Sequence, residues 1–144
     1  MYELLVGNKT MYKGNEFYIC KESEGKMYIY TWDKSIVDKS FIQVSGNIST
    51  NYQIMYKKYV NKDEIEEIYS FRKVFQYKGV KFLDVTQDCD GNYWIGSDDK
   101  KIAEALGLEA YIFDKYGYTI YHKLIKSNDK DLVMIGEDRR VTCL

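Results

Sequence analysis

The sequence predicts an α+β protein, in which two diverged β-β-α-β-β repeats form a mainly antiparallel sheet with a few short helices. Three observations support this fold: an internal repeat, glycine-containing turns between runs of β-branched and aromatic residues, and one clear helix signal after a hairpin. At 144 residues we expect a single domain. Its expected parts are repeat 1 at about 12–60, a linker helix at about 62–69, repeat 2 at about 77–126 and C-terminal strands at 132–144.

The internal repeat begins at two matching turns. Tyr12-Lys13-Gly14 returns as Tyr77-Lys78-Gly79, 65 residues later. After one inserted residue the match continues at an offset of 66, ending with Lys57 on Lys123. The alignment contains 12 identities over about 49 positions, whereas ordinary residue usage gives about three. The pattern indicates a duplication.

Each repeat contains four expected strands, two before a helix and two after it. In both Tyr-Lys-Gly turns, glycine supplies the positive φ that a tight hairpin needs. Asp90-Gly91 is a second hairpin signal. The expected strands are 17–21, 26–31, 41–44 and 51–60 in repeat 1, and 80–86, 93–96, 110–113 and 118–126 in repeat 2. A β-rich run at 71–77 precedes repeat 2, and two strands, 132–135 and 141–144, flank a turn at 136–138.

The clearest helix follows the hairpin of repeat 2. Ser97 is an expected N-cap, Asp98 and Asp99 place negative charge on the first turn, and Gly107 suits the C-terminal cap. Asp33 is the counterpart of Asp99 before a shorter helix at 36–38, and we expect both aspartates to cap helices. Asn61 is expected to cap the acidic linker helix.

Composition points to a folded cytoplasmic protein. Hydrophobic residues make up 45% of the chain and charged residues 30%, which are globular values. The N-terminus lacks a secretory pattern, and no apolar run reaches 18 residues, so we expect no membrane association. Cys20, Cys89 and Cys143 are widely spaced, which favours free thiols in a reducing cytosol over a zinc site.

The charge pattern argues against duplex DNA as a partner. The net charge is −1, but residues 1–60 carry +2 and residues 61–144 carry −3. Between Phe82 and Asp99 there are five acidic residues and no basic residue. Because neutralisation of phosphates supplies much of the affinity for DNA, a DNA-binding protein shows the opposite pattern.

Motifs for cofactors and catalysis are lacking, and we expect neither a cofactor nor enzyme activity. His122 is the one histidine, so a nucleophile and base pair would have to use it. Residues 88–92 have their glycine at the wrong position for a calcium loop, which favours a hairpin turn. Residues 7–10 end in Lys-Thr but lack the upstream glycine of a phosphate loop.

Three features carry a family resemblance: the paired Tyr-Lys-Gly turns, the helix end at 102–107, and the Tyr-x-Ile strands at 52–54 and 118–120. With them the chain resembles the immunity proteins of bacterial polymorphic-toxin systems of the contact-dependent inhibition type. The resemblance implies stoichiometric binding of a cognate, basic protein toxin and occlusion of its active site. Acids steer a basic partner, so the expected partner-binding residues are Asp63, Glu64, Glu66, Glu67, Asp84, Asp88, Asp90 and Asp98.

Two alternative functions remain open. The chain could bind single-stranded nucleic acid, with aromatic rings stacking on bases and Lys57 and Lys58 contacting phosphates. It could also be a small enzyme of unrecognised type, whose pocket would gather Asp, Glu or His122. The stacking residues of the first alternative are Tyr28, Tyr30, Trp32, Tyr52, Tyr56 and Tyr59.

Overall fold

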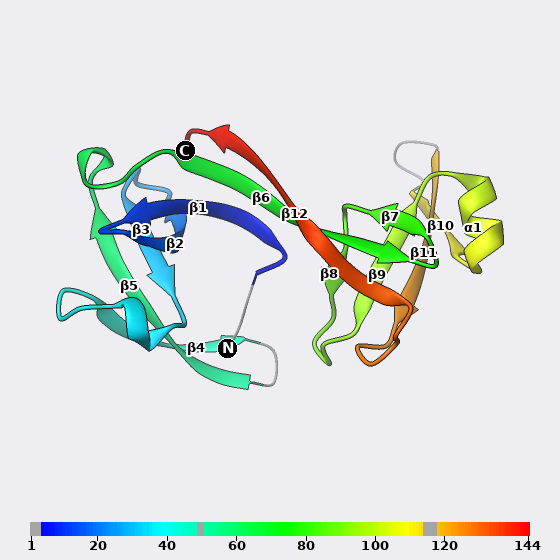
Figure 1. Cartoon of the computed structure of the whole chain (residues 1–144), viewed down its shortest axis with the longest axis horizontal. Coiled ribbons are helices and arrows are strands. Elements are labelled where there is room, and N and C mark those ends of the chain that lie inside the picture. Colours follow the sequence, from blue (N-terminus) through cyan, green and yellow to red (C-terminus); the bar gives the residue numbers. More distant parts are fainter. Residues whose placement is uncertain (1–3, 49–50, 114–117) are drawn as a thin grey trace. The chain divides into compact units, whose positions relative to one another are not determined.

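The computed structural model describes residues 4–48, 51–113 and 118–144. The chain divides into two compact units (Figure 1). Unit 1 comprises Met1–Arg72 and Asp138–Leu144, and unit 2 comprises Lys73–Glu137. The division falls inside strands β6 (Ile68–Tyr77) and β12 (Leu132–Thr142), which therefore contribute residues to both units.

Unit 1 is built on an antiparallel sheet. Within the described residues the sheet order is β12-β6-β1-β2-β3-β5-β4. The part of β6 that belongs to unit 2 also pairs with β7, a strand of unit 2. Two 3-10 helices, η1 (Lys34–Ile36) and η2 (Lys62–Glu64), connect the strands of this unit. The remaining strands of unit 1 are β1 (Val6–Tyr12), β2 (Asn15–Lys21), β3 (Met27–Thr31), β4 (Ile42–Ile48) and β5 (Asn51–Val60).

Unit 2 holds a smaller sheet and the α-helix. In the part of the chain that the structure describes, this sheet has four strands in the order β10-β11-β9-β8. The helix α1 (Lys100–Leu106) buries Ala103 and Leu106. The strands of unit 2 are β7 (Val80–Phe82), β8 (Thr86–Gln87), β9 (Tyr93–Ser97), β10 (Glu109–Phe113) and β11 (Tyr118–Ile125).

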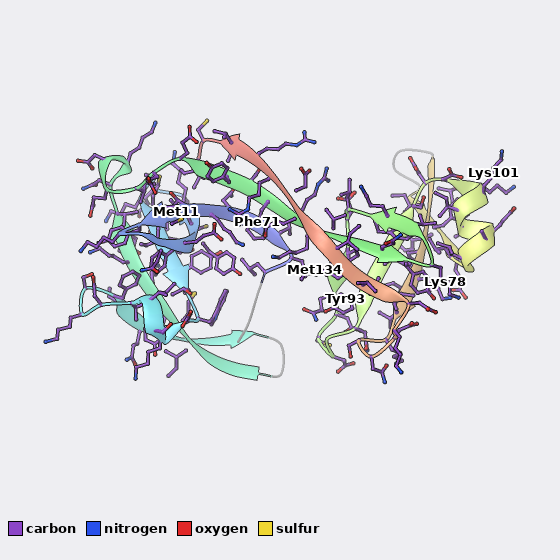
Figure 2. All side chains as sticks on the ribbon, viewed as in Figure 1. Met11, Phe71, Lys78, Tyr93, Lys101 and Met134 are labelled. Carbon is purple, nitrogen blue, oxygen red and sulfur yellow. The ribbon has the colours of Figure 1, made fainter. Side chains whose placement is uncertain are left out.

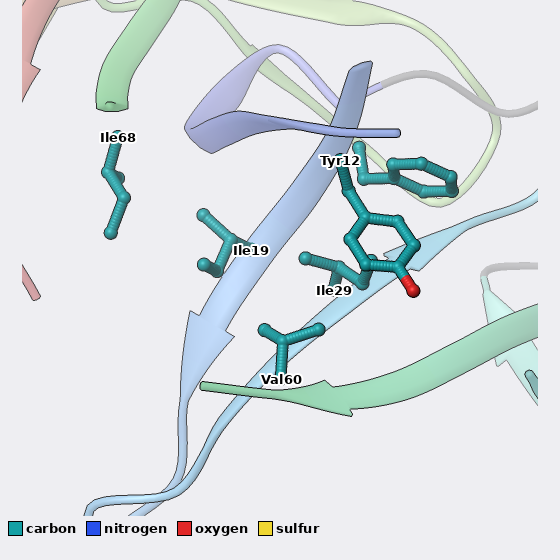
Figure 3. Packing of buried hydrophobic residues seen from close by; sticks show 6 residues of the cluster. Tyr12, Ile19, Ile29, Val60 and Ile68 are labelled. Atoms are coloured by element: carbon teal, nitrogen blue, oxygen red, sulfur yellow. The ribbon is translucent and has the colours of Figure 1, made fainter. Parts of the chain in front are cut away.

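The core of unit 1 lies on one face of its sheet. Phe17 and Ile19 alternate with Tyr18 along β2, so they point to the face opposite Tyr18. Ile29 of β3 is 0% exposed and packs with Val60 of β5 (Figure 3). The full buried cluster is Tyr12, Phe17, Ile19, Ile29, Val60 and Ile68.

The core of unit 2 joins α1 to its sheet. Ile95 of β9 is completely buried, and Ile125 of β11 is nearly so. Alternation along β9 places Trp94 and Gly96 on the face opposite Ile95. The other buried apolar residues of this unit are Phe75, Tyr77, Phe82, Val85, Ala103, Leu106 and Leu108.

The two Tyr-Lys-Gly turns have nearly the same backbone. The φ angles are 47° at Lys13 and 81° at Gly14, and 49° at Lys78 and 81° at Gly79. Two successive positive φ angles are typical of the type I′ hairpin, whose twist matches that of its strands. The glycine requirement inferred from the sequence is therefore confirmed at both turns.

The predicted antiparallel architecture with short helices is confirmed, but several predicted elements differ. Repeat 1 forms a 3-10 helix at Lys34–Ile36, not at 36–38. The N-cap of α1 is Asp99, whose carboxylate accepts from the N–H of Lys101 and Ile102, while Ser97 Oγ accepts from the N–H of Asp99. Asp33 and Asp99 are both caps as predicted.

The predicted linker helix over 62–69 is wrong. Only the 3-10 turn Lys62–Glu64 forms, and β6 begins at Ile68. The hydroxyl of Thr10 donates to the carbonyl oxygens of Glu66 and Glu67, at 3.1 Å each, and Glu66 N–H donates to Met11 O. These contacts with β1 hold the segment extended, and a helix over 62–69 could not make them.

The C-terminal region is one strand, Leu132–Thr142, not two strands around a turn. Gly136 has no positive φ, and the acids expected in the turn instead pair with cations of β6. Glu137 lies 2.9 Å from Lys73, and Asp138 lies 3.6 Å from Arg72. The expected strand at 80–86 is also divided, into β7 and β8, and β1 was not predicted.

Among the helices that the structure describes, none is long and apolar enough to cross a membrane.

Candidate functional site

Four of the expected partner-binding acids belong to unit 1, and most of them have structural contacts. The Glu64 carboxylate accepts from the N–H of Asn61 at 2.9 Å, which closes the turn of η2. The Glu67 carboxylate accepts from the Tyr69 hydroxyl at 3.1 Å. Asp63 is exposed, and Glu66 bonds to β1 through its backbone. Two of these carboxylates, those of Glu64 and Glu67, thus have partners within the protein, while all four residues are exposed.

The other four expected acids belong to unit 2. Asp88 closes its own turn, because its carboxylate accepts from the N–H groups of Asp90 and Asn92. The side chain of Asp90 lies exposed at the same turn. Asp84 and Asp98 instead line one groove. The structure thus brings two of the eight expected residues together at a concave surface.

The groove of unit 2 has an apolar lining with acidic residues, and its volume is about 540 Å³. Apolar lining comes from β7 and the segment after it, from Ile102 of α1 and from Ile120 of β11. Gly96 lies in the groove without a side chain, and a Cβ built there would meet no atom closer than 3.5 Å. The complete lining is Val80, Lys81, Phe82, Leu83, Asp84, Gly96, Ser97, Asp98, Ile102 and Ile120.

Unit 1 presents an aromatic face on the side of its sheet opposite the core. Tyr28, Tyr30 and Trp32 follow every second position of the chain through and beyond β3, so they share this face. Their rings contact one another at centroid distances of 5.6 Å and 5.7 Å. Tyr18 contacts Tyr30 and Trp32, and Phe71 of β6, labelled in Figure 2, contacts Tyr18 at 5.9 Å.

The cations of the aromatic face each have a carboxylate partner. Lys57 Nζ lies 3.1 Å from Glu22 Oε1, 4.1 Å from the Tyr28 ring centroid and 4.8 Å from that of Tyr59. The Tyr59 hydroxyl donates to the same carboxylate oxygen at 2.6 Å. Hydrogen bonds from Tyr59 and Lys57 lower the pKa of Glu22. The positive charge of Lys57 is therefore balanced within the protein.

A second lysine on this face is buried. Lys9 is 7% exposed, and its Nζ lies 4.3 Å from the Phe71 ring centroid and 3.5 Å from Glu16 Oε1. Glu16 also accepts two hydrogen bonds from Arg139. A buried cation needs such partners, because desolvation is costly without them. Lys9 thus supports the sheet rather than offering a charge to a ligand.

The aromatic residues predicted to stack on bases are only partly on this surface. Tyr56 is 7% exposed and lies opposite Thr31 on the core face, so its prediction as a stacking residue is wrong. The side chain of Tyr52 lies outside the described residues. Tyr18 and Phe71 were not predicted on this side of the sheet, and both are buried, so they pack with the aromatic rings without offering area to a ligand. The alternation of Tyr18 with Phe17 and Ile19 would have identified its side.

His122 lies in a column of three rings on unit 2. Its ring centroid is 4.7 Å from that of Trp94 and 5.2 Å from that of Tyr111, and both interplanar angles are near 30°. These residues come from adjacent strands β9, β11 and β10. His122 packs as an aromatic residue of the sheet face, and it is not among the groove residues.

Two antiparallel units, one with an aromatic sheet face and one with a groove lined by apolar and acidic residues, define a β-rich protein. No group of metal-ligating side chains is found in the described ranges. The chain belongs to the family described as Uncharacterised conserved protein UCP033725, whose model matches residues 6–140. No curated protein and no solved structure matches the chain.

Proposed function

We propose that the protein is a cytoplasmic, stoichiometric protein-binding inhibitor, an immunity protein that neutralises a cognate bacterial toxin by occluding its active site. The observation that supports protein binding is the aromatic face of unit 1, with its cations already paired. The assignment to toxin immunity is supported by the resemblance of the paired turns, the helix end and the Tyr-x-Ile strands.

The aromatic face has the composition of a protein interface. Tyrosine and tryptophan dominate binding hot spots, because they bury a large area at a small cost in conformational entropy. Tyr28, Tyr30 and Trp32 are half-buried, and Tyr59 is 44% exposed, so each ring keeps area that a partner can cover. Interface centres are also depleted of unpaired charge, which agrees with the Lys57–Glu22 pair.

The same pairing disfavours the alternative of single-stranded nucleic acid. Proteins that bind single-stranded nucleic acid combine stacking rings with a positively charged groove that follows the nucleic-acid backbone. Here Lys57 is bound by Glu22, and Lys9 is buried beside Glu16. The rings also contact one another at tilted or edge-on angles, as between Tyr30 and Trp32 at 86°. Phosphates would therefore find little free positive charge on this face.

The test is affinity isolation of the tagged protein from its native host, followed by an activity assay of the protein recovered with it. We expect one toxin, bound at a 1:1 ratio, whose activity falls to background when inhibitor equals toxin. Tyr30→Ala should weaken binding by at least about tenfold, as hot-spot residues do. Tyr111→Ala is the matched control, because it removes a 48% exposed tyrosine from unit 2.

Two results would contradict the proposal. A captured protein whose activity is unaffected at saturation would exclude inhibition. Salt-dependent binding of a single-stranded oligonucleotide that Tyr30→Ala abolishes would instead favour nucleic acid, since phosphate contacts weaken steeply with salt.

We also propose that the two units arose by duplication. Within the described residues, β2-β3-β5-β4 and β8-β9-β11-β10 have the same strand order. Val44 pairs with Met55 and Ala110 pairs with Tyr121, which is the same register at an offset of 66. If the duplication is old, the same internal correspondence should recur in other family members. Its absence from most members would count against it.

A further inference from the structure

The groove of unit 2 combines an apolar lining with charge of one predominant sign. Ile102 and Ile120 contribute to its apolar surface, and Leu83 beside them is 37% exposed. Asp84 and Asp98 bring two carboxylates, and Lys81 brings one cation. Within the described residues, the exposed Asp98 carboxylate makes no hydrogen bond or ion pair. The groove therefore has a net negative charge.

We propose that this groove binds an arginine side chain of the protein partner. The inference rests on the proposed function in that the arginine belongs to a bound protein, but it concerns a different surface from the aromatic face. The apolar lining takes the methylene stem, and the Asp98 carboxylate takes the guanidinium, while Asp84 adds negative charge to the same lining. We assign an arginine side chain to this groove because its positive charge complements the negative charge of the lining.

Arginine fits this groove better than lysine. A guanidinium is less strongly hydrated than an ammonium, so it loses less on entering an apolar groove, and its planar fork can bond more than one acceptor at once. The lining offers two neighbouring acceptors, the Ser97 hydroxyl at the end of β9 and the Asp98 carboxylate that follows it. A lysine would present one compact charge to the same set.

Gly96 keeps the groove open. It lies opposite His122 in the β9–β11 register, and the nearest atoms to a Cβ at this position are Tyr121 O at 3.5 Å and Ile120 Cγ2 at 3.9 Å. These are ordinary contact distances, so alanine fits without a shift. A longer side chain would extend into the space that the arginine stem occupies.

The test is a titration of the 15N-labelled full chain with an acetylated and amidated Gly-Gly-Arg-Gly-Gly peptide, followed by NMR. We expect saturable shifts at Gly96, Ile102 and Ile120, with a dissociation constant on the order of millimolar. The citrulline peptide, which has nearly the same shape without the charge, should bind at least about fivefold more weakly, and the lysine peptide about threefold more weakly.

Four variants locate the site. Asp98→Asn should weaken arginine binding by about fivefold, and Gly96→Leu should abolish it while the dispersed spectrum is kept. Asp90→Asn is the matched control, since it removes an exposed acid of unit 2 that does not line the groove. Gly96→Ala should leave binding within about twofold, and it serves if leucine disturbs the fold.

The proposal is overturned if citrulline binds as well as arginine, if the shifts lie outside the groove, or if Asp98→Asn and Asp90→Asn behave alike. These outcomes are separate from those of the inhibition assay. Loss of toxin inhibition with intact arginine binding would reject the proposed function alone, and the reverse result would reject this site alone.

Discussion

Arg139 and Glu16 form a two-pronged ion pair within unit 1, although they are 123 residues apart in the chain. Arg139 Nη1 lies 2.7 Å from Glu16 Oε2, and Nη2 lies 3.0 Å from Oε1. The pair ties the end of β12 to the hairpin of β1 and β2. Hydrogen bonding by Arg139 is the largest cause of the lowered pKa of Glu16.

Loss of this pair should cost stability at neutral pH and not in acid. Arg139→Ala is expected to lower the free energy of unfolding by about 1 kcal/mol at pH 7, because the pair is bidentate but both side chains are partly exposed. The folded pKa of Glu16 lies below its ordinary value of 4.5, so the stabilisation is present above pH 4.5 and is lost as the pH falls through the folded pKa. Urea unfolding at pH 7 and at successively lower pH values below 4.5 follows the loss.

Arg140→Ala is the control for this pair. Its side chain is 74% exposed, and its Nε lies 3.7 Å from Oδ2 of Asp138. We expect a change within about 0.5 kcal/mol at every pH. Equal effects of the two substitutions, or an Arg139→Ala effect that does not diminish as the pH falls below 4.5, would show that the bidentate pair does not stabilise the fold.

The sequence predicted local structure well where one or two residues determine it. Gly14 and Gly79 were identified as turn residues because glycine adopts a positive φ more readily than other residues do. Asp99 was identified as a helix cap because aspartate is favoured before a run of helix formers, although Ser97 rather than Asp99 was expected at the N-cap position itself. The strand β5 was predicted at its observed bounds, since its run of β-formers is long and ends at Asn61.

Prediction failed where contacts distant in sequence decide the conformation. The helical pattern at 62–69 is overridden by hydrogen bonds with Thr10 and Met11 of β1, and these could not be inferred without knowing that β1 lies alongside. Glu137 and Asp138 were expected in a turn, but they pair with Lys73 and Arg72. The groove was not predicted for the same reason, because its lining comes from separate strands and α1.

The core of unit 1 should depend strongly on Ile29. This side chain is 0% exposed at the centre of the buried cluster, so Ile29→Ala removes buried surface and leaves a cavity. We expect a loss of about 2–5 kcal/mol in the free energy of unfolding. Ile42→Ala, at a 57% exposed position of β4, should change it by less than about 0.5 kcal/mol. Similar losses would place Ile29 outside a well-packed core.

The two type I′ turns should require glycine at their second position. Gly14→Ala and Gly79→Ala each place a Cβ at a φ of 81° and should cost about 1 kcal/mol, although nothing within 4 Å would clash with it. Gly136→Ala is a matched control, because that glycine also has no neighbour within 4 Å but has no positive φ. We expect Gly136→Ala to be neutral or stabilising by thermal unfolding. Equal effects at all three positions would reject the backbone explanation.

Tyr28 should ionise at unusually high pH. A hydrogen bond with Cys20 is the largest cause that raises the pKa of Tyr28 to about 12, and burial acts in the same direction. The sign of the stability effect follows from a folded pKa above the ordinary 10.0: the stabilisation is complete below pH 10.0 and is lost as the pH rises towards 12. Ring-carbon NMR of labelled tyrosine follows this one hydroxyl separately from the other tyrosines.

Removal of the thiol tests the cause of this shift. In Cys20→Ala the Tyr28 midpoint should fall towards 10.0, so that at pH 11 most of the Tyr28 hydroxyl is ionised, whereas about one tenth is ionised in the unmodified protein. Cys143→Ala removes an exposed thiol of the same unit and should leave the midpoint unchanged. If Cys20→Ala leaves the midpoint near 12, burial rather than the hydrogen bond holds the Tyr28 proton, and the aromatic face is less accessible to solvent than its half-exposed rings indicate.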